Sequence, residues 1–548
     1  MIPRLVVAGT HSGVGKTTVA TGLVAAFAAR GRRVTAFKVG PDFIDPSYHA
    51  LASGRPGRNL DPFLCGPELV GPLFAHGAAG ADLAVVEGVM GLFDGAAGGD
   101  ELASTAQVAK LLGAPVLLVV DAAGLARSVA ALVHGYATWD PGLRLAGVVL
   151  NRVASDRHEQ LLRQALAPLP VVAVLRRQAA IATPERHLGL VPAAERAAAA
   201  ARTVAALGEA VAAAADLDAV AALAAAAPPL AVTPWDPHAA LAAGGSGGLK
   251  SEAGTRVVGG HLEPSGSPPV SRRSGGLKSE AGTRVVGGHL EPSGSPPVNR
   301  PPGGRAVRVA VAAGPAFTFV YQENLELLEA AGAELAGFDP TADGDLPAGS
   351  DAVYLGGGFP ETYGEELAAN RPMRAAVRAF AAGGRPLVAE CGGLLYLSRS
   401  LDGRPMCGVL PAEARMGGRL TLGYRRARAA GPSVLAAPGL RVRGHEFHYS
   451  ALDPPAGPSP AWLLDGDAQV PADPRPEGFV AGGVHASYLH THWAGRPDLP
   501  ARLVAAATRA RQARSTGGPG GSRARPEPPS PAPGWSRAVA PRSTGVAP

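Results

Sequence analysis

The sequence is poor in cysteine and has no long uninterrupted apolar run. Its 548 residues include only Cys65, Cys391 and Cys407, too few and too scattered for a disulfide framework. No stretch reaches the roughly 18 uncharged apolar residues that a membrane helix requires. The chain passes from Met1–Arg4 directly into an apolar strand, without the features of a signal peptide. We therefore expect a cytoplasmic protein with no membrane partner.

An excess of acidic residues is also absent. Lys and Arg total 51 against 45 Asp and Glu, a net charge of +6 that would suit a nucleic-acid partner. Residues 509–548, however, contain seven Arg and one Glu, which alone supply that +6 and leave the rest of the chain formally neutral. We attribute the basic charge to a disordered tail and predict no nucleic-acid partner.

An alternation of apolar strand runs with helical stretches occurs twice in the sequence. In the first alternation, strands are predicted at 4–9, 33–38, 83–87, 115–120, 145–150 and 171–175. Their nearly continuous Val, Leu and Ala predict strands buried on both faces, as in a parallel sheet covered by helices. The second alternation begins at 306, with strands predicted at 307–312, 352–356 and 386–390 and further β-type sequence at 440–449.

A region rich in Gly, Ser and Pro separates the two alternations. Its segment 246–270 recurs letter for letter at 274–298, but two copies with little apolar surface do not make a solenoid. We interpret the copies as a duplicated, disordered linker insertion. The predicted organisation is α/β, with domains at 1–228 and 306–508, a disordered linker at 229–305 and a disordered basic tail at 509–548.

A glycine-rich loop joins the first predicted strand to a helix. Residues 9–18 read Gly-Thr-His-Ser-Gly-Val-Gly-Lys-Thr-Thr, and the amides of such a loop and helix start cradle phosphate groups. The spacing departs from the usual P-loop, because Thr10 stands where the first glycine belongs. We predict an ATP site in which Lys16 reaches the β- and γ-phosphates and Thr17 ligates Mg²⁺. The residues predicted to bind the nucleotide are Gly13, Gly15, Lys16, Thr17 and Thr18.

Acidic residues follow two further strands of the first predicted sheet, at the edge where parallel sheets bind ligands. Glu87 is the first choice for a second Mg²⁺ ligand and Asp42 the next, with a surface acid or helix cap as the alternative for each. Asp45 and Asp94 stand in Asp-Pro and Asp-Gly turns, so turn formation alone would explain them. Asn151, at the end of a strand, would either bind the nucleotide base or cap the backbone.

The second predicted domain places a cysteine at a sharp strand-to-helix turn. Cys391 follows a predicted strand and precedes two glycines, an arrangement that exposes a nucleophile and lowers its pKa at a helix N-terminus. A packing cysteine, the alternative, would not need the glycines. His490 is the first choice of base; His492 would assist it, or the two would form half of a metal site. The amides of Gly356–Gly358, with that of Gly392, would stabilise an oxyanion.

These segments together resemble one family, the cobyrinate and hydrogenobyrinate a,c-diamide synthases of cobalamin biosynthesis. The resemblance covers nearly all of 1–228 and 306–500, and its most specific parts are PDFIDP within KVGPDFIDPSYH (38–49) and RGHEFHYS (443–450). The other matching stretches are SGVGKTT (12–18), RNLDPFL (58–64), EGVMGLFDG (87–95), PERHLGL (184–190), YLGGGFPE (354–361), AECGGLLYL (389–397) and ASYLHTHW (486–493).

The resemblance implies a dethiobiotin-synthetase-like ATP domain joined to a class I-like glutaminase domain. The implied reaction is the ATP- and glutamine-dependent amidation of the a and c carboxylates of a corrin, through acyl phosphates. The family roles that carry over are ATP binding by Lys16 and Thr17, metal binding or carboxylate activation by Asp42, Glu87 and Asp94, the nucleophile for Cys391 and the base for His490.

The partners that the resemblance implies are a corrin polycarboxylate and glutamine, and a homodimer is left open. Arg186 and His187 would bind substrate carboxylates or form a structural salt bridge. Two positions depart from the family pattern. His492 stands where class I glutaminases carry a Glu two residues after the base, so the third triad member is unassigned. Gly314 stands where a polar residue such as Asp is expected, which weakens support for a substrate or interface contact there.

Three alternative functions remain open on the sequence. A sibling of the cobyric acid synthase type would amidate other corrin carboxylates with the same chemistry, although segment 38–49 favours the a,c branch. A relative that amidates nickel sirohydrochlorin is the second alternative. The third belongs to another class, a P-loop ATPase that acts through binding and carries an inactive glutaminase. The intact Cys391 and His490 argue against it.

Overall fold

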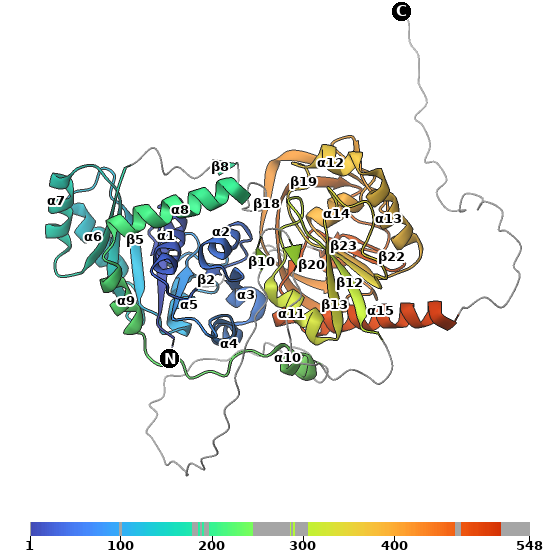
Figure 1. Cartoon of the computed structure of the whole chain (residues 1–548), viewed down its shortest axis with the longest axis horizontal. Coiled ribbons are helices and arrows are strands. Elements are labelled where there is room, and N and C mark those ends of the chain that lie inside the picture. The colour runs from blue at the N-terminus through green and yellow to red at the C-terminus, as the bar shows by residue number, and fades with distance from the viewer. Residues whose placement is uncertain are drawn as a thin grey trace, which may run out of the picture.

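The computed structural model describes residues 2–97, 101–177, 185–186, 189–190, 197–244, 285–286, 289–290, 305–465 and 473–516. It consists of two α/β lobes that meet side by side (Figure 1). The first lobe lies within residues 2–227 and the second begins at 305. None of the helices in these ranges combines the length and apolar character of a membrane span.

The first domain is built on a seven-stranded parallel sheet with strand order β3-β2-β4-β1-β5-β6-β7. The predicted strands are confirmed, because each apolar run of the first alternation forms one buried strand. β3 had no predicted counterpart, since three residues with one apolar side chain give no recognisable run. The strands are β1 (Arg4–Gly9), β2 (Val34–Val39), β3 (Arg58–Leu60), β4 (Leu83–Glu87), β5 (Val116–Asp121), β6 (Leu145–Val153) and β7 (Val171–Arg176).

Helices cover this sheet. α8 packs on α1 so closely that a Cβ added to Gly22 would lie 2.8 Å from the carbonyl oxygen of Leu207, and α8 runs across one side of the lobe (Figure 1). The helices are α1 (Lys16–Ala29), α2 (Ile44–Ser53), α3 (Pro62–Cys65), α4 (Pro67–Gly77), α5 (Thr105–Leu111), α6 (Ser128–Thr138), α7 (Asp156–Leu166), α8 (Ala197–Ala214) and α9 (Leu217–Ala225).

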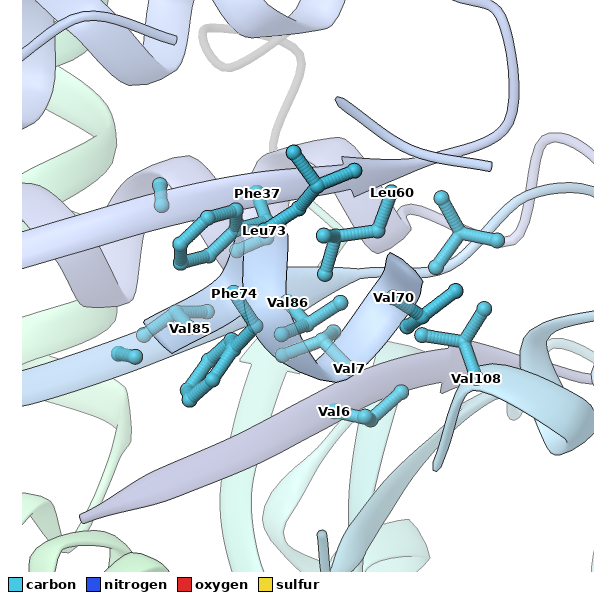
Figure 2. Close-up of a cluster of buried hydrophobic side chains, with 14 of the residues drawn as sticks. Val6, Val7, Phe37, Leu60, Val70, Leu73, Phe74, Val85, Val86 and Val108 are labelled. Carbon is cyan, nitrogen blue, oxygen red and sulfur yellow. The ribbon is translucent and has the colours of Figure 1, made fainter. Parts of the chain in front are cut away.

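Valine, leucine and phenylalanine side chains from strands β1 to β4 and from α4 and α5 form a core between this sheet and those helices (Figure 2). The rings of Phe37 on β2 and Phe74 on α4 lie 5.1 Å apart between centroids. Each such fully buried side chain stabilises the fold by about 2 kcal/mol relative to an exposed one. This packing fixes the strand ends from which the first site is built.

The second domain contains a six-stranded sheet with order β13-β12-β14-β15-β23-β22, parallel except for the β22–β23 pair. Its strands are β12 (Val307–Ala312), β13 (Ala333–Phe338), β14 (Ala352–Leu355), β15 (Leu387–Glu390), β22 (Phe479–Ala481) and β23 (Val484–Ser487). Its helices are α11 (Gln322–Ala330), α12 (Gly364–Ala369), α13 (Arg371–Ala382), α14 (Gly392–Leu397) and α15 (Asp498–Thr516), with a 3-10 turn η3 (Trp493–Gly495).

A second sheet of the same domain contains the long antiparallel pair β18–β19, whose strands lie at the boundary between the lobes (Figure 1). β19 confirms the β-type sequence predicted at 440–449. The strands are β16 (Ser400–Leu401), β17 (Arg404–Pro405), β18 (Glu413–Ala429), β19 (Arg441–Asp453), β20 (Trp462–Leu464), β21 (Arg475–Glu477) and β24 (His490–Thr491).

The segments at the predicted domain ends extend further than the sequence indicated. Trp235 is buried, its amide donates to Pro72 O at 3.0 Å, and α10 (Pro237–Gly244) lies beside α11 and α15. α15 continues to Thr516, beyond the predicted domain end at 508. Residues up to 244 and up to 516, predicted as linker and tail, thus contact the domains: Trp235 through a buried apolar side chain, and Arg511 and Arg514 through Asp351 at 3.7 and 2.6 Å.

The duplicated segment and the rest of the tail lie outside the described residues, apart from the short antiparallel pair β10 (Val285–Val286) and β11 (His289–Leu290). His187 also lies outside them. Arg186 is described only as part of the two-residue strand β8 (Glu185–Arg186), which pairs with β9 (Gly189–Leu190).

Candidate active sites

The phosphate loop connects β1 to α1, as predicted. Gly13 and Gly15 have φ of +75° and +101°, a left-handed conformation that glycine adopts without strain. The Lys16 ammonium donates to the carbonyl oxygens of His11 at 3.1 Å and Met90 at 2.5 Å. Burial, reinforced by the positive charge of Lys38, lowers the pKa of Lys16 to about 8. Thr18 lies half-buried in the first turn of the same helix.

A buried cluster of charged side chains faces the start of α1. The Thr17 hydroxyl donates to Glu87 Oε1 at 2.6 Å and lies 3.2 Å from Asp45 Oδ2. Lys38 Nζ, from β2, contacts the same two carboxylates at 2.7 and 2.5 Å. His49 Nε2 lies 2.7 Å from the other oxygen of Glu87. The Thr17 hydroxyl thus lies where the ends of β2 and β4 meet the first turn of α2.

The pKa values of this cluster follow from burial and mutual charge. Burial opposes ionisation of Glu87, but Lys38 and His49 hold its pKa well below the ordinary value. Burial also disfavours the Lys38 ammonium, yet Asp45 and Glu87 raise its pKa above the ordinary value. Burial and the neighbouring charges of Asp42 and Glu87 raise the pKa of Asp45. The cluster therefore combines one firmly anionic carboxylate with one firmly cationic amine.

Asp42 and Asp45 differ in their contacts to Thr17, and the difference is the reverse of the order of importance predicted from the sequence. Asp45, explained there as a turn residue, contacts Thr17, whereas Asp42 makes no hydrogen bond to Thr17 in the described part of the chain. Asp42 Oδ1 accepts from the Ile44 amide at 2.7 Å, and its Oδ2 lies 3.9 Å from Lys38 Nζ. The sequence did contain a sign of this role for Asp45. The residue stands beside Pro46 at the start of a helix, and an acid in the first turn of that helix lies near the neighbouring strand ends.

Asp94 and Asn151 support the loop from two sides. Asp94 Oδ2 accepts from the Gly91 amide at 2.8 Å, the predicted turn contact, yet its charge also acts on Lys16. Asn151 Nδ2 donates to Val14 O at 2.9 Å, and a Cβ added to Gly15 would overlap the same amide. Of its two predicted roles, the described contacts of Asn151 correspond to backbone capping.

Sequence reasoning missed the next residue along the chain, Arg152. It has a positive φ of 59°, its guanidinium pairs with Asp121 at 2.5 Å, and it donates to Gly13 O at 3.3 Å. An arginine after a strand end carries no distinctive pattern, so nothing in the sequence pointed to it.

The predicted cysteine turn is present between β15 and α14. Cys391 has φ 45° and ψ −98°, a strained conformation for a residue with a side chain. A Cβ added to Gly392 would lie 2.9 Å from Gly358 N, and one added to Gly393 would lie 2.5 Å from Leu355 O. The two glycines are therefore required for the close approach of the backbones. The exposed thiol of lowered pKa that the sequence predicted is not found, because Cys391 is buried and burial raises the pKa of its thiol, which keeps it neutral.

His490 lies near this turn, but no hydrogen bond joins it to Cys391 in the described ranges. Gly357 lies between them. A Cβ added to Gly357 would overlap His490 Cε1, and one added to Gly392 would lie 3.3 Å from Gly357 C. The His490 ring is fully buried, and neither of its nitrogens has a hydrogen-bond partner among the described residues. Burial lowers its pKa to about 3.

His492 belongs to a different environment. Its ring packs on Tyr321 with centroids 4.4 Å apart, and its Nε2 lies 3.5 Å from Glu323 Oε2. Although burial opposes protonation, Cys65 and Glu323 raise the pKa of His492 to about 10. The two histidines thus have different neighbours, and the described residues hold no group of three or more His, Cys, Asp or Glu arranged for a metal ion.

Glu390, immediately before the cysteine, was also missed. It is buried and accepts hydrogen bonds from Thr491 Oγ1 at 2.9 Å, Thr491 N at 3.3 Å and Tyr354 OH at 3.0 Å. Burial raises its pKa to about 7. This carboxyl group, on the last residue of β15, links the strand that leads to Cys391 to Thr491, the residue after His490. A buried Glu at a strand end resembles any other strand residue in the sequence.

Polar side chains hold the two domains together next to both sites. Arg58 of β3 contacts Glu323 at 2.7 Å and also pairs with Glu326, and both of these glutamates are on α11. His76 of α4 contacts Glu326 at 2.9 Å. The Tyr424 hydroxyl donates to Asp61 at 2.8 Å.

Gly314, the second departure from the family pattern, has φ +85° and faces the carboxylate of Asp339.

The comparisons with known proteins agree with this division. Residues 5–191 match the model of the CobQ/CobB/MinD/ParA nucleotide binding domain, and residues 308–498 match the CobB/CobQ-like glutamine amidotransferase domain. A hydrogenobyrinate a,c-diamide synthase of Streptomyces coelicolor is 54% identical over 92% of this chain and 97% of its own length.

Two further relatives show the same coverage. A hydrogenobyrinate a,c-diamide synthase of Mycobacterium tuberculosis is 47% identical over 92% of this chain and 98% of its own length. A cobyrinate a,c-diamide synthase of Syntrophotalea carbinolica is 41% identical, again over 92% and 98%. With a nucleotide-binding domain and a glutamine amidotransferase domain in this order, the chain belongs to the family of hydrogenobyrinate and cobyrinate a,c-diamide synthases.

Proposed function

We propose that this protein uses ATP and glutamine to convert the a and c carboxylates of hydrogenobyrinate or cobyrinate into amides. The observation that carries the proposal is the pairing, in one chain, of the Thr17–Glu87–Asp45 cluster with the Cys391 turn. The identity to named synthases over nearly their whole length supports the choice of substrate.

The residues of the first site fit ATP and Mg²⁺. Gly13 and Gly15 give the loop before α1 the left-handed turns of a phosphate-binding loop, the space beside Gly13 is open, and Lys16 supplies a buried positive charge. Mg²⁺ would be held by Thr17 and Glu87, with Asp45 beside them, and would neutralise the charge of the transferring phosphoryl group. We assign Asp42 and Asp94 to metal binding or carboxylate activation at this site. An oxygen of the substrate carboxylate attacks the γ-phosphorus, the bond from that phosphorus to the ADP oxygen breaks, and an acyl phosphate and ADP are formed.

At the second site, we propose that Cys391 Sγ attacks the carboxamide carbon of glutamine. The thiol proton passes through His490 to the departing nitrogen, ammonia leaves, and water hydrolyses the thioester to glutamate. We propose that the amides of Gly358 and Gly392 donate to the oxyanion, since a Cβ added to Gly392 would lie 2.9 Å from Gly358 N, whereas the Gly357 amide already donates to Phe319 O at 3.1 Å. Ammonia then displaces phosphate from the acyl phosphate in the first domain.

We further propose that the enzyme works in the cytoplasm without a nucleic-acid partner. It would act as a monomer or a homodimer, and light scattering would distinguish these two states.

Two substitutions test the halves separately. Cys391→Ala should abolish amidation with glutamine and preserve amidation with a high concentration of ammonium. Lys16→Ala should abolish amidation with either nitrogen source and preserve glutamine hydrolysis. Diamide formation by Lys16→Ala, or glutamine-dependent turnover by Cys391→Ala, would contradict these assignments.

Product mass tests the substrate assignment. Hydrogenobyrinate and cobyrinate, assayed side by side, should each be checked for a product carrying two amides. Amidation of other side chains would favour the cobyric acid synthase type instead. Absence of any glutamine hydrolysis would favour the P-loop binding protein.

A further inference from the structure

Phe43 is a residue of the first domain whose ring is packed in the second. It precedes α2, in the loop that connects β2 to Asp45, and is 9% exposed. Its ring is stacked on Phe319 with centroids 5.0 Å apart and lies 4.6 Å from Tyr321. It also lies 5.2 Å from the ring of His490. A single side chain of the nucleotide-binding domain thus reaches the proposed base of the other domain.

His490 lacks the carboxylate that would ordinarily orient such a ring. The residue two positions later, His492, contacts Tyr321 and Glu323, and both nitrogens of His490 are without partners among the described residues. Packing alone therefore holds the ring. His445 stacks on it at 4.8 Å with an interplanar angle of 12°, and Gly357 lies against its edge. Phe43 supplies the contact from across the domain boundary.

The loop that carries Phe43 also reaches the first site. Asn59 Nδ2 donates to Gly40 O at 2.8 Å and to Asp42 O at 2.6 Å, which fixes the backbone on one side of Phe43. On the other side, Asp45 contacts Thr17 at 3.2 Å. The same short loop therefore contacts Thr17 of the first site through Asp45 and the ring of His490 through Phe43.

We propose that Phe43 is a positioning residue for glutamine hydrolysis, which holds the His490 ring in place of the missing triad carboxylate. The proposal rests on the assignment of Cys391 and His490 made above. Its consequence is that the glutaminase is complete only while the first domain is docked, so that ammonia is released only when the domain that forms the acyl phosphate is in contact.

The test compares Phe43→Ala and Phe43→Leu with Phe63→Ala in the full-length protein. Phe63 is the matched control, because it is also buried and crosses the boundary to stack on Tyr424 at 4.3 Å, away from His490. Glutamine hydrolysis, glutamine-dependent amidation and ammonium-dependent amidation are each measured as kcat and KM. Phe43→Leu keeps the proposal testable if the alanine variant does not fold.

Loss of the ring should lower kcat for glutamine hydrolysis on the order of ten-fold or more, since small misplacements of a reacting group are costly. KM for glutamine and the ammonium-dependent reaction should stay within about two-fold, because neither depends on the orientation of His490. Phe63→Ala should show no such selective loss.

An unchanged kcat for glutamine hydrolysis would overturn the proposal. So would an equal loss with both nitrogen sources or a raised KM for the corrin, which would assign Phe43 to the first site. An equal selective loss in Phe63→Ala would show that general docking, not Phe43, is responsible. If the wild-type protein makes no diamide, the proposed substrate is wrong, yet glutamine hydrolysis by these variants still decides the role of Phe43.

Discussion

Removal of Arg58 should destabilise the protein strongly, because this residue neutralises buried charge at the domain boundary. The Arg58 side chain is 9% exposed, and its partner Glu323 is 1% exposed. Truncation of one member of a buried ion pair leaves the other without compensation, at a cost of about 3–5 kcal/mol. Arg58→Ala should therefore lower the free energy of unfolding by an amount in this range, measured by urea titration with tryptophan fluorescence.

The pH dependence makes this prediction sharper. Burial raises the pKa of Glu323, but Arg58 and then His492 outweigh it and hold that pKa below the ordinary value. A carboxyl with a lowered pKa contributes stability above its unfolded value of about 4.3, and this is lost on acidification through the folded value. In Arg58→Ala the burial effect is less opposed and the pKa of Glu323 rises. Protonation then relieves the penalty, so the loss of stability should be smaller at pH 5 than at pH 7.5.

A surface pair provides the control. Arg33 and Asp82 contact each other at 2.7 Å, but the Arg33 side chain is 69% exposed, so Arg33→Ala should change stability little at either pH. Addition of Glu323→Gln to Arg58→Ala should recover part of the lost stability, since no uncompensated charge then remains at that position. The reasoning is refuted if Arg58→Ala and Arg33→Ala are equally mild, or if the Arg58→Ala penalty grows on acidification.

Three further predictions concern the two sites. Glu87→Gln should lower ATP-dependent amidation on the order of a hundred-fold while glutamine hydrolysis persists, because it removes the charge beside Thr17; ADP release measures it. Asp45→Asn should cost more amidation activity than Asp42→Asn, since only Asp45 contacts Thr17, and the reverse order would restore the sequence-based ranking. Glu390 has a pKa raised by burial to about 7, so its neutral form stabilises the fold and that stability falls as pH rises from about 4.3 towards 7. Glu390→Gln should therefore gain stability relative to wild type between pH 5 and pH 8 in thermal melts, and a constant difference would contradict this.

The sequence predicted the sheets well and the contacts between them poorly. Continuous apolar runs identify buried parallel strands because each strand must be apolar on both faces, and the glycines around Lys16 and Cys391 identify tight turns. The predicted strand β12 (Val307–Ala312) and the Cys391 turn followed from such local rules. Arg58, in contrast, follows no local rule, since its partners on α11 are more than 260 residues away in sequence.

The same limit explains the candidate site residues. The sequence could predict that Glu87 and Thr17 lie close together, because the strand ends of a parallel sheet meet at one edge. The choice between Asp42 and Asp45 depended on the start of α2, which fixes the direction of each side chain and is poorly defined in sequence. His492 could not be assigned from the sequence, because its partners Tyr321 and Glu323 come from a distant segment of the second domain.

The position of α10 changes what the duplicated segment can affect. Gly244, at the end of α10, lies against Pro497, and Arg305, where the described part of the second domain begins, has a carbonyl that accepts from Arg511 of α15 at 2.5 Å. Both ends of the intervening stretch are therefore anchored on the second domain, so its length does not act as a tether that sets the separation of the two reactions. Lengthening a closed loop is thermodynamically inexpensive, about 0.6 kcal/mol for each doubling. A chain with one copy of the repeat should therefore keep the same spacing between its two sites and nearly the same stability as the chain with two.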